Sequence, residues 1–275
     1  MKLDGVLLVD KPAGVTSHDV VAAERRRLAA DAGDRSGAGR PKVGHAGTLD
    51  PFATGLLLVL VGRATRAQRY LMALPKRYET VARLGFTSTT GDVDGQIAAG
   101  RMPPEPLALP TGRISQRPPA YSALRVGGKR AYALARAGEP VELPEREVDV
   151  QRFELLWRAG ERAAFAIQCG SGTYVRALIA DLGDAYCLEL RRTGIGPFDI
   201  AEAGRFIGLS EALGFLPAVE LAGEDAQRAG HGVAVAVPGH DVETGTVRLI
   251  DAAGLIALAE PRADGTLKPV VGFRG

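Results

Sequence analysis

An uninterrupted apolar run at residues 56–61 is the feature that most constrains the fold of this chain. It follows a polar loop in the stretch KVGHAGTLDPFATGLLLVLVG, residues 42–62. Six apolar residues between two glycines have the length of a strand buried on both faces, and no apolar stretch of the sequence reaches the ~18 to 20 residues of a membrane-spanning helix. The run therefore predicts a buried strand, with the preceding loop ordered against a rigid element.

Other short patterns surround this run. A buried strand is predicted at residues 6–9, where a Lys-Pro pair ends it. Residues 16–30 predict a helix with Ser17 as its N-cap and Asp19 in its first turn. Residues 76–86 alternate as a strand does, which places one set on a single face: Tyr78, Thr80, Ala82 and Leu84.

The C-terminal part of the sequence has a different character. From about Glu224 it contains short strand patterns separated by turn residues, with little helical periodicity. This change predicts two units: an α+β body over residues 1–222 and a small β module over residues 223–275.

Net charge alone does not identify a partner, since the chain carries only +2 at pH 7. Basic residues nevertheless gather in loops and at the ends of elements, as in RVGGKRAYALARAG, residues 125–138. Such patches suit the neutralisation of phosphates; a solvated surface with scattered arginines is the alternative.

Two cysteines, Cys169 and Cys187, are too few for a disulfide framework or a four-ligand zinc site. We expect both to be reduced and buried in a cytoplasmic protein. The amino-terminal segment agrees with this location, because its short apolar run is followed at once by Asp10 and Lys11, unlike a secretory signal.

The loop before the apolar run holds the strongest candidate for chemistry. Gly44 and Gly47 allow unusual backbone angles, and Pro51 stiffens the exit of the loop. Asp50 is thereby held where a carboxylate can act as a nucleophile, a general base or a metal ligand. A metal site lacks further ligands nearby apart from His45. A purely structural role for Asp50 in a turn or a helix cap is the alternative.

A second candidate segment is CGSGTYVRALIADLG, residues 169–183. It lacks the spacing and the lysine of a nucleotide phosphate loop. Instead it presents Tyr174, which offers a flat face and a hydroxyl, and Arg176, which can hold and aim a carboxylate. Taken singly, these residues would be interpreted as a packing residue and a surface charge.

A third segment, Asp92-x-Asp94-Gly95, has the spacing of the start of a calcium loop. The later acidic ligands of such a loop are missing, so the segment predicts a turn.

Several segments together resemble one family, the bacterial tRNA pseudouridine synthases of the TruB type. They occur in the family's order over most of residues 5–200: GVLLVDKPAGVTSHDVV, VGHAGTLDPFATGLLLV, PKRYETVARLG, QRPPAYSALRVGGKRAYALARAG, SGTYVRALIADLG and LRRTGIGPF. The Gly-His-x-Gly-x-Leu-Asp-Pro element is long and specific to the family.

The resemblance implies a pseudouridine synthase fold of the α+β class, with a mixed, mainly antiparallel central sheet and a small C-terminal β domain that is PUA-like. Residues 116–138 match the family's thumb, an RNA-contacting insertion. Its basic residues would contact phosphates: Arg117, Arg125, Lys129, Arg130 and Arg136.

Roles for individual residues also follow from the resemblance. Asp50 matches the catalytic aspartate, and Arg176 matches the arginine paired with it. Tyr78 matches the tyrosine that stacks on the target base. Further substrate-binding positions are His45, Tyr174 and Leu190. The connection before Leu190 is several residues shorter than is usual in the family.

The implied activity is isomerisation of the uridine at position 55, in the T-arm of tRNA, to pseudouridine. The N1–C1′ bond breaks, the uracil turns and C5 joins C1′, so neither a cofactor nor a metal is expected. The target nucleotide must leave its stack to reach the enzyme. We expect a monomer that acts without an obligate protein partner and without a membrane.

Two other functions stay open on the sequence alone. One is a non-catalytic RNA-binding protein on the same scaffold. The other is a carboxylate-dependent hydrolase of a small molecule, for which the sequence offers no second acid at a persuasive position.

Overall fold

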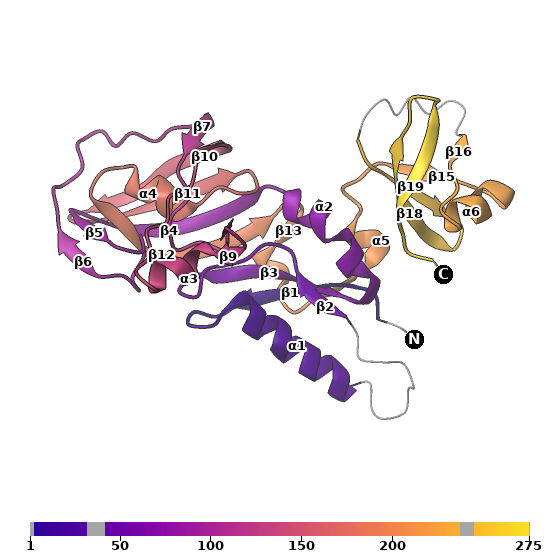
Figure 1. Ribbon diagram of the computed structural model, residues 1–275, viewed down its shortest axis with the longest axis horizontal. Coiled ribbons are helices and arrows are strands. Elements are labelled where there is room, and N and C mark those ends of the chain that lie inside the picture. Colours follow the sequence, from indigo (N-terminus) through magenta and orange to yellow (C-terminus); the bar gives the residue numbers. More distant parts are fainter. Residues whose placement is uncertain (1–2, 32–41, 237–244, 275) are drawn as a thin grey trace.

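The computed structural model describes residues 3–31, 42–236 and 245–274 of the chain. An α+β body is built on one large sheet, and a smaller β module lies beside one end of it (Figure 1). Among the described residues, no helix is both long and apolar enough to cross a membrane.

The body is organised around a ten-stranded sheet. Its strands are β1 (Gly5–Lys11), β2 (Val43–His45), β3 (Thr54–Val61), β4 (Lys76–Leu84), β7 (Gly112–Gln116), β10 (Arg146–Ala159), β11 (Arg162–Cys169), β12 (Ala185–Ile195), β13 (Phe198–Asp199) and β14 (Phe206–Gly208). The main order is β14-β1-β3-β12-β4-β11-β10-β7, with β2 beside β3 and β13 beside β12. Of the pairings described in this sheet, only β3–β12 is parallel, which confirms the predicted mixed, mainly antiparallel arrangement.

Helices and two small hairpins complete the body. The helices are α1 (Ser17–Asp31), the 3-10 helix η1 (Gly62–Ala67), α2 (Gln68–Ala73), α3 (Ala131–Arg136), α4 (Val175–Ala180), the 3-10 helix η2 (Ile200–Glu202) and α5 (Leu209–Ala212). The hairpins are β5 (Phe86–Ser88) with β6 (Ile97–Ala99), and β8 (Arg125–Val126) with β9 (Lys129–Arg130). The second hairpin and α3 lie within residues 116–138.

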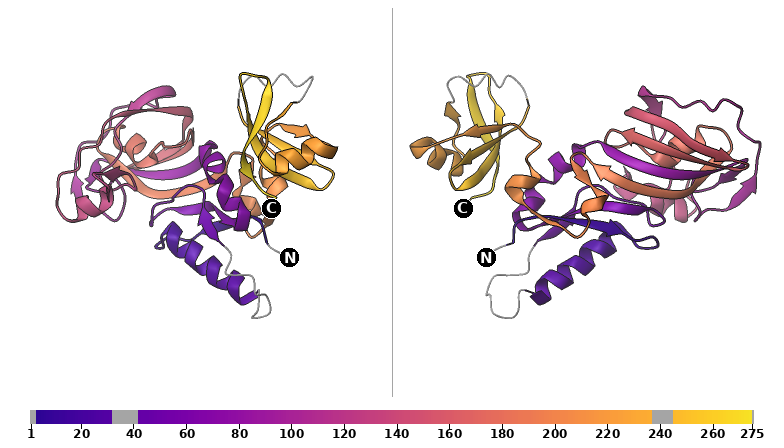
Figure 2. Two further views of the ribbon diagram at one scale, coloured as in Figure 1. Left: turned by 45° about the vertical axis from the view of Figure 1, so that its right-hand side comes forward. Right: turned by 180° about the vertical axis from the view of Figure 1, so that it is seen from behind.

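The amino-terminal half of the sheet is covered on both faces. Leu57 and Val59 of β3 pack with Val20 and Val21 of α1 on one face. The alternate residues of β3 pack against η1 and α2 on the other face: Leu56, Leu58 and Leu60. Residues 56–61 are all fully buried, as the apolar run predicts. Figure 2 shows α1 lying along one side of these strands in both views.

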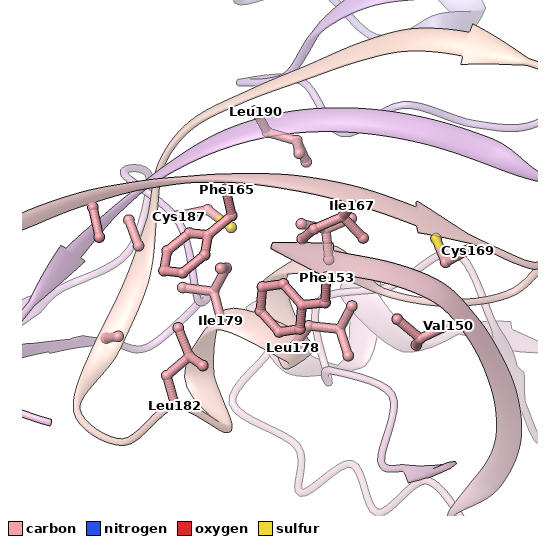
Figure 3. Close-up of a cluster of buried hydrophobic side chains, with 14 of the residues drawn as sticks. Val150, Phe153, Phe165, Ile167, Cys169, Leu178, Ile179, Leu182, Cys187 and Leu190 are labelled. Atoms are coloured by element: carbon pink, nitrogen blue, oxygen red, sulfur yellow. The ribbon is translucent and has the colours of Figure 1, made fainter. Parts of the chain in front are cut away.

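The other half of the sheet packs against α4. Leu178 and Ile179 lie in a buried cluster with Phe153 of β10 and Phe165 of β11 (Figure 3). Since Arg176 is the second residue of this helix, the apolar packing of α4 also fixes where the arginine lies. The cysteines of the sequence are buried and free.

The parallel contact between β3 and β12 requires a glycine at position 55. Gly55 has a φ of +104°, and a Cβ on it would lie 2.2 Å from the carbonyl oxygen of Arg192. Arg192 is opposite Gly55 on one side and opposite Tyr78 of β4 on the other. The close approach therefore brings β3, the strand after the Asp50 loop, next to β12 with Arg192, and β12 in turn lies next to β4 with Tyr78.

The predicted strands are present, but the predicted cap of α1 is wrong. The N–H of Asp19 donates to Thr16 Oγ1 at 3.1 Å, and the N–H of Thr16 donates to Asp19 Oδ2 at 2.9 Å, so Thr16 is the N-cap. Ser17 is buried and bonds instead to the backbone of Leu49. Two adjacent hydroxyl residues made the cap ambiguous, and the tertiary partner decided between them.

The C-terminal module contains a five-stranded sheet with the order β15-β17-β18-β19-β16. Its elements are β15 (Ala218–Glu220), α6 (Gly223–Gly230), β16 (Val235–Ala236), β17 (Val247–Asp251), β18 (Gly254–Pro261) and β19 (Thr266–Gly272). Because β15 pairs with β17, this sheet begins before residue 223. The module touches the body at α2 and η1, where Arg69 pairs with Glu260 at 3.1 Å and Arg66 donates to the carbonyl of Gly272 at 2.7 Å.

Candidate active site

The Asp50 loop, residues 45–51, is held by side chains from several elements. Lys11, at the end of β1, is fully buried, and its Nζ donates to the carbonyl of Pro51 at 3.2 Å. Ser17 of α1 accepts from the N–H of Leu49 at 2.9 Å and donates to the Leu49 carbonyl at 3.2 Å. Both contacts fix the backbone on either side of Asp50.

The first part of the loop is held from the opposite direction. Gln68 of α2 donates to the carbonyl of His45 at 2.6 Å. Arg192 of β12 donates to the carbonyls of Gly47 at 3.0 Å and Thr48 at 3.4 Å. Gly47 has a φ of +95°, which turns the chain so that these carbonyls face inward. A loop with this many internal acceptors satisfied is ordered without a ligand.

Asp50 and Arg176 meet although 126 residues separate them in sequence. The Nε of Arg176 donates to Asp50 Oδ2 at 2.9 Å. The arginine side chain is only 3% exposed, whereas the aspartate side chain is 31% exposed. A buried guanidinium thus aims a carboxylate whose remaining surface stays open to a substrate. The predicted pair is present.

The same guanidinium joins two further segments. Its Nη1 donates to the carbonyl of Thr90 at 2.5 Å, and its Nη2 donates to the carbonyl of Tyr121 at 2.8 Å. Tyr121 belongs to residues 116–138, so Arg176 links the Asp50 loop to the base of that insertion.

Asp92 is a member of the site that the sequence did not identify. Its Oδ2 lies 3.3 Å from Arg176 Nη1, and its Oδ1 accepts from the N–H of Asp94 at 3.1 Å and from the hydroxyl of Thr90. Burial raises the pKa of Asp92, while the Thr90 hydroxyl and Arg176 act in the opposite direction. The predicted turn is present, but no local signal shows that its first acid faces a distant arginine.

Tyr78 lies near the Asp50 loop. It is on β4, which pairs with β12, the strand that carries Arg192. Tyr78 is opposite Arg192, and Thr80 is opposite Leu190, so all four side chains share one face of the sheet. Burial raises the pKa of the Tyr78 phenol. The hydroxyl of Tyr78 is therefore neutral near pH 7 and can donate as well as accept a hydrogen bond.

Leu190 lies in the middle of β12, after a short connection from α4. α4 ends at Ala180 and β12 begins at Ala185, so the turn between them is brief. Leu190 is buried in the same apolar cluster as Leu49, and the partly buried Tyr78 packs against this cluster. The sequence-predicted leucine is thus adjacent to the predicted tyrosine and to the Asp50 loop.

Tyr174 is positioned by the residue that begins the insertion. The buried Gln116 accepts from the N–H of Tyr174 at 2.8 Å and donates to its carbonyl at 3.1 Å. The guanidinium carbon of Arg146 lies 5.0 Å from the centre of the Tyr174 ring. The backbone of Tyr174 is fixed directly before α4, two residues from Arg176.

His45 is a half-buried histidine at the start of the Asp50 loop. Its ring lies edge-to-face against His18, with 5.3 Å between centroids. Burial, with His18 and Arg192 nearby, lowers the pKa of His45 to about 4. The imidazole is therefore neutral near pH 7, and its buried Nδ1 has no hydrogen-bond partner among the described residues.

The basic residues of the insertion are exposed. Lys129 lies 4.0 Å from Glu139, Arg125 donates to the carbonyl of Gly128 at 3.4 Å, and Arg136 stacks 5.6 Å from the ring centre of Tyr132. Arg130 donates to the carbonyl of Ala123 at 2.5 Å. These partners lie within or next to the insertion, so its cations face solvent at one end of the site.

A groove of about 500 Å³ lies close to these site residues. Its lining includes Leu190, Phe52 and Trp157, whereas Asp50 and Arg176 are not among the residues that line it. Across the described residues, no group of three or more histidine, cysteine, aspartate or glutamate side chains could hold a metal ion.

The chain is similar to known pseudouridylate synthases. Residues 35–175 match the model of the TruB family pseudouridylate synthases, N-terminal domain. The tRNA pseudouridine synthase B of Thermobifida fusca (strain YX) is 41% identical over 306 residues, covering 99% of each chain. That of Ectopseudomonas mendocina (strain ymp) is 40% identical over 300 residues, covering 98% of this chain and 94% of its own.

Solved structures share the fold. A chain of an H/ACA RNP bound to a substrate RNA containing 2′-deoxyuridine superimposes with a TM-score of 0.70 at 24% identity, covering 98% of this chain and 85% of that chain. A chain of a Cbf5-Nop10-Gar1 complex gives a TM-score of 0.67 at 26% identity, covering 98% and 84%.

Proposed function

The chain belongs to the TruB family of pseudouridylate synthases, and on that premise we propose that it converts a uridine of tRNA to pseudouridine, with Asp50 as the catalytic carboxylate. The uridine at position 55, in the T-arm, is the proposed target.

One observation carries the assignment to Asp50: the ion pair with Arg176. The two residues come from segments far apart in sequence, the guanidinium is buried, and the carboxylate remains partly open. A buried arginine stabilises the ionised form of a neighbouring carboxylate and fixes its direction. The loop that carries Asp50 is held by Lys11, Ser17 and Arg192, so little ordering remains when RNA binds.

The reaction needs few groups from the protein. The N1–C1′ bond of uridine breaks, the uracil turns, a C5–C1′ bond forms, and the proton on C5 is transferred so that N1 ends protonated. Asp50 stabilises the detached intermediate, by attack at C1′, by addition to the base or by assisting elimination from the sugar. Arg176 keeps the carboxylate ionised while the base and sugar exclude water.

The remaining residues hold the extruded nucleotide. Tyr78 stacks on the uracil and offers a hydroxyl for the final proton transfer. Leu190 packs beside Tyr78 and lines the pocket for the base. Tyr174 binds the uridine, and His45 contacts the RNA beside it. Flat and apolar side chains suit a base that has left its stack.

RNA outside the pocket is held by the two peripheral parts. Arg125, Lys129 and Arg130 contact phosphates of the T-arm, together with Arg117 and Arg136. The C-terminal module acts as a PUA-like RNA-binding domain. The protein works as a cytoplasmic monomer without an obligate protein partner.

The contacts of Asp92, the second carboxylate near Arg176, argue against the hydrolase alternative. Asp92 is 7% exposed at its side chain and has both oxygens engaged by Arg176, Thr90 and Asp94. It is therefore not free to deliver a proton to a small-molecule substrate.

The proposal is tested with an unmodified tRNA transcript. Incubation with the wild-type protein, followed by mapping of pseudouridine, is expected to show conversion at position 55 and to require Asp50. An Asp50→Asn variant should bind the transcript and form no pseudouridine. Binding without conversion by the wild type would support a non-catalytic RNA-binding protein instead.

A further inference from the structure

Arg192 is a buried arginine that the reaction described above does not use. Its side chain is among the largest that are fully buried, with the residue 1% exposed. Its three donor nitrogens reach carbonyls: Nε to Leu56 at 2.7 Å, Nη2 to Gly47 at 3.0 Å and Nη1 to Thr48 at 3.4 Å. Within the described chain, no carboxylate lies within 4.0 Å of this guanidinium.

A buried cation without a carboxylate is an expensive way to stabilise a sheet. Desolvation of a charge costs several kcal/mol, and apolar side chains of similar size often serve a core as well or better. Neighbouring buried cations add to the cost, because Arg192 contributes to lowering the pKa of Lys11 and of Lys76, after the larger effect of burial. The position therefore favours a role that needs directed hydrogen bonds.

The Arg192 side chain lies between two parts of the proposed site, the Asp50 loop and Tyr78. Two of its acceptors belong to the Asp50 loop. In the β4–β12 register, Arg192 is directly opposite Tyr78, so both side chains emerge on the same face. Burial raises the pKa of the Tyr78 phenol, and the nearby charge of Arg192 acts in the opposite direction, as expected for two side chains that lie opposite each other in the register.

We propose that Arg192 is a positioning residue that ties the Asp50 loop to the hydroxyl of Tyr78 and so sets the geometry between the carboxylate and the stacked base; this inference rests on the proposed function. A guanidinium suits the task because its donors lie in one plane and diverge toward separate acceptors. In this arrangement the Tyr78 oxygen accepts from the guanidinium, so its own proton is directed away from Arg192.

Lysine and glutamine variants test the role. Arg192→Lys keeps the charge and loses the planar fork, and Arg192→Gln keeps donors and loses the charge. Both are expected to lower the single-turnover rate on a T-arm stem-loop by about 10²-fold, the cost of a small misplacement of reacting groups. The RNA dissociation constant should change less than about threefold. Arg191→Lys is the matched control, since Arg191 is half-exposed and pairs with Asp10, and should leave the rate unchanged.

A second readout separates positioning from a general loss of folded protein. With uridine deuterated at C5, the variants should show a larger isotope effect than the wild type, because removal of the C5 proton becomes slower relative to the other steps. A merely structural role would lower the amount of active enzyme and leave the isotope effect unchanged. Such a result would overturn the proposal, as would wild-type rates in both variants or a loss of RNA affinity that accounts for the loss of rate.

If neither variant is soluble, the guanidinium NMR signals of Arg192 in Tyr78→Phe provide the test. A shift relative to the wild type is expected, and unchanged signals would refute the link to Tyr78. Absence of pseudouridine with the wild-type protein would instead defeat the proposed function itself. The two failures are therefore distinguishable.

Discussion

The Asp50 loop and the thumb insertion, residues 45–51 and 116–138, differ in how the protein holds them. Lys11, Ser17, Gln68 and Arg192 all donate to backbone carbonyls of the loop. The cations of the insertion, by contrast, are exposed: Arg125, Lys129 and Arg130 bond within the insertion or next to it, and Arg117 pairs with Glu145 at 3.1 Å. Gln116 at its first position and Tyr121 are the points where it joins the buried site.

This difference separates two tasks. A carboxylate that does chemistry must be in place before the substrate arrives, because ordering it during the reaction would raise the barrier. Side chains that hold phosphates can adjust to the RNA and be ordered by it. Changes in the loop should therefore alter rate and stability, and changes in the insertion should alter affinity.

The largest effect is expected for Asp50→Asn. The amide keeps the size of the side chain and removes the charge, so pseudouridine formation should fall at least about 10³-fold. RNA binding should persist, because the insertion is untouched. Single-turnover assays and a binding titration measure the two quantities. Asp10→Asn, at an exposed ion pair with Arg191, is the control; equal losses in both variants would show that the effect is not specific to Asp50.

Arg176→Lys should have the next largest effect. A lysine cannot reach Asp50, Asp92 and two carbonyls at once, so the rate is expected to drop about 10²-fold. The free energy of unfolding should fall by about 2–4 kcal/mol, because buried Asp92 loses part of its partner. Chemical denaturation and single-turnover assays check this. Arg152→Lys, at an exposed pair with Glu154, should change neither quantity, and wild-type behaviour of Arg176→Lys would contradict the comparison.

The pH dependence of the free energy of unfolding tests the burial of His45 in the Asp50 loop. Its pKa falls from 6.5 to about 4 in the fold, so between these values the unfolded chain binds more protons than the folded one. The contribution of the neutral His45 to the free energy of unfolding is therefore fully present above pH 6.5 and is lost as the pH falls toward 4. Relative to His45→Gln, the wild type should lose about 2–3 kcal/mol between pH 7 and pH 4.

Urea denaturation of both proteins across this pH range provides the measurement, with His231→Gln as a control at an exposed histidine. The His231 variant should follow the wild type. A constant difference between wild type and His45→Gln would refute burial of a neutral imidazole in the loop.

The smallest effect is expected for the double variant Lys129→Ala, Arg130→Ala. The rate at saturating RNA should be unchanged, while the affinity for RNA should fall about tenfold. The slope of log affinity against log salt concentration should become shallower by about 1 to 2. Binding titrations at several salt concentrations test this against Arg152→Ala. A reduced rate at saturating RNA would contradict the separation of roles, in which the Asp50 loop sets the rate and the insertion sets the affinity.

Much of the site was predictable from local sequence patterns together with the resemblance to the family. The apolar run predicted β3, the alternation at Tyr78 predicted β4, and the family resemblance predicted that Asp50 and Arg176 meet. Asp92 was missed because the turn pattern explains its local conformation without revealing its distant partner. Arg192 was missed because two adjacent arginines in sequence do not show which is buried.

Periodicity, glycine and proline act over a few residues, so local patterns were enough to predict the main strands and to identify the Asp50 loop. Which polar groups hydrogen-bond to one another became clear only in the folded chain. Thr16 caps α1, while Ser17 bonds to the backbone of Leu49. Arg176 pairs with both Asp50 and Asp92, which come from separate turns. Buried polar groups must find partners wherever the fold brings them, and that choice depends on strand register and helix packing across the whole chain.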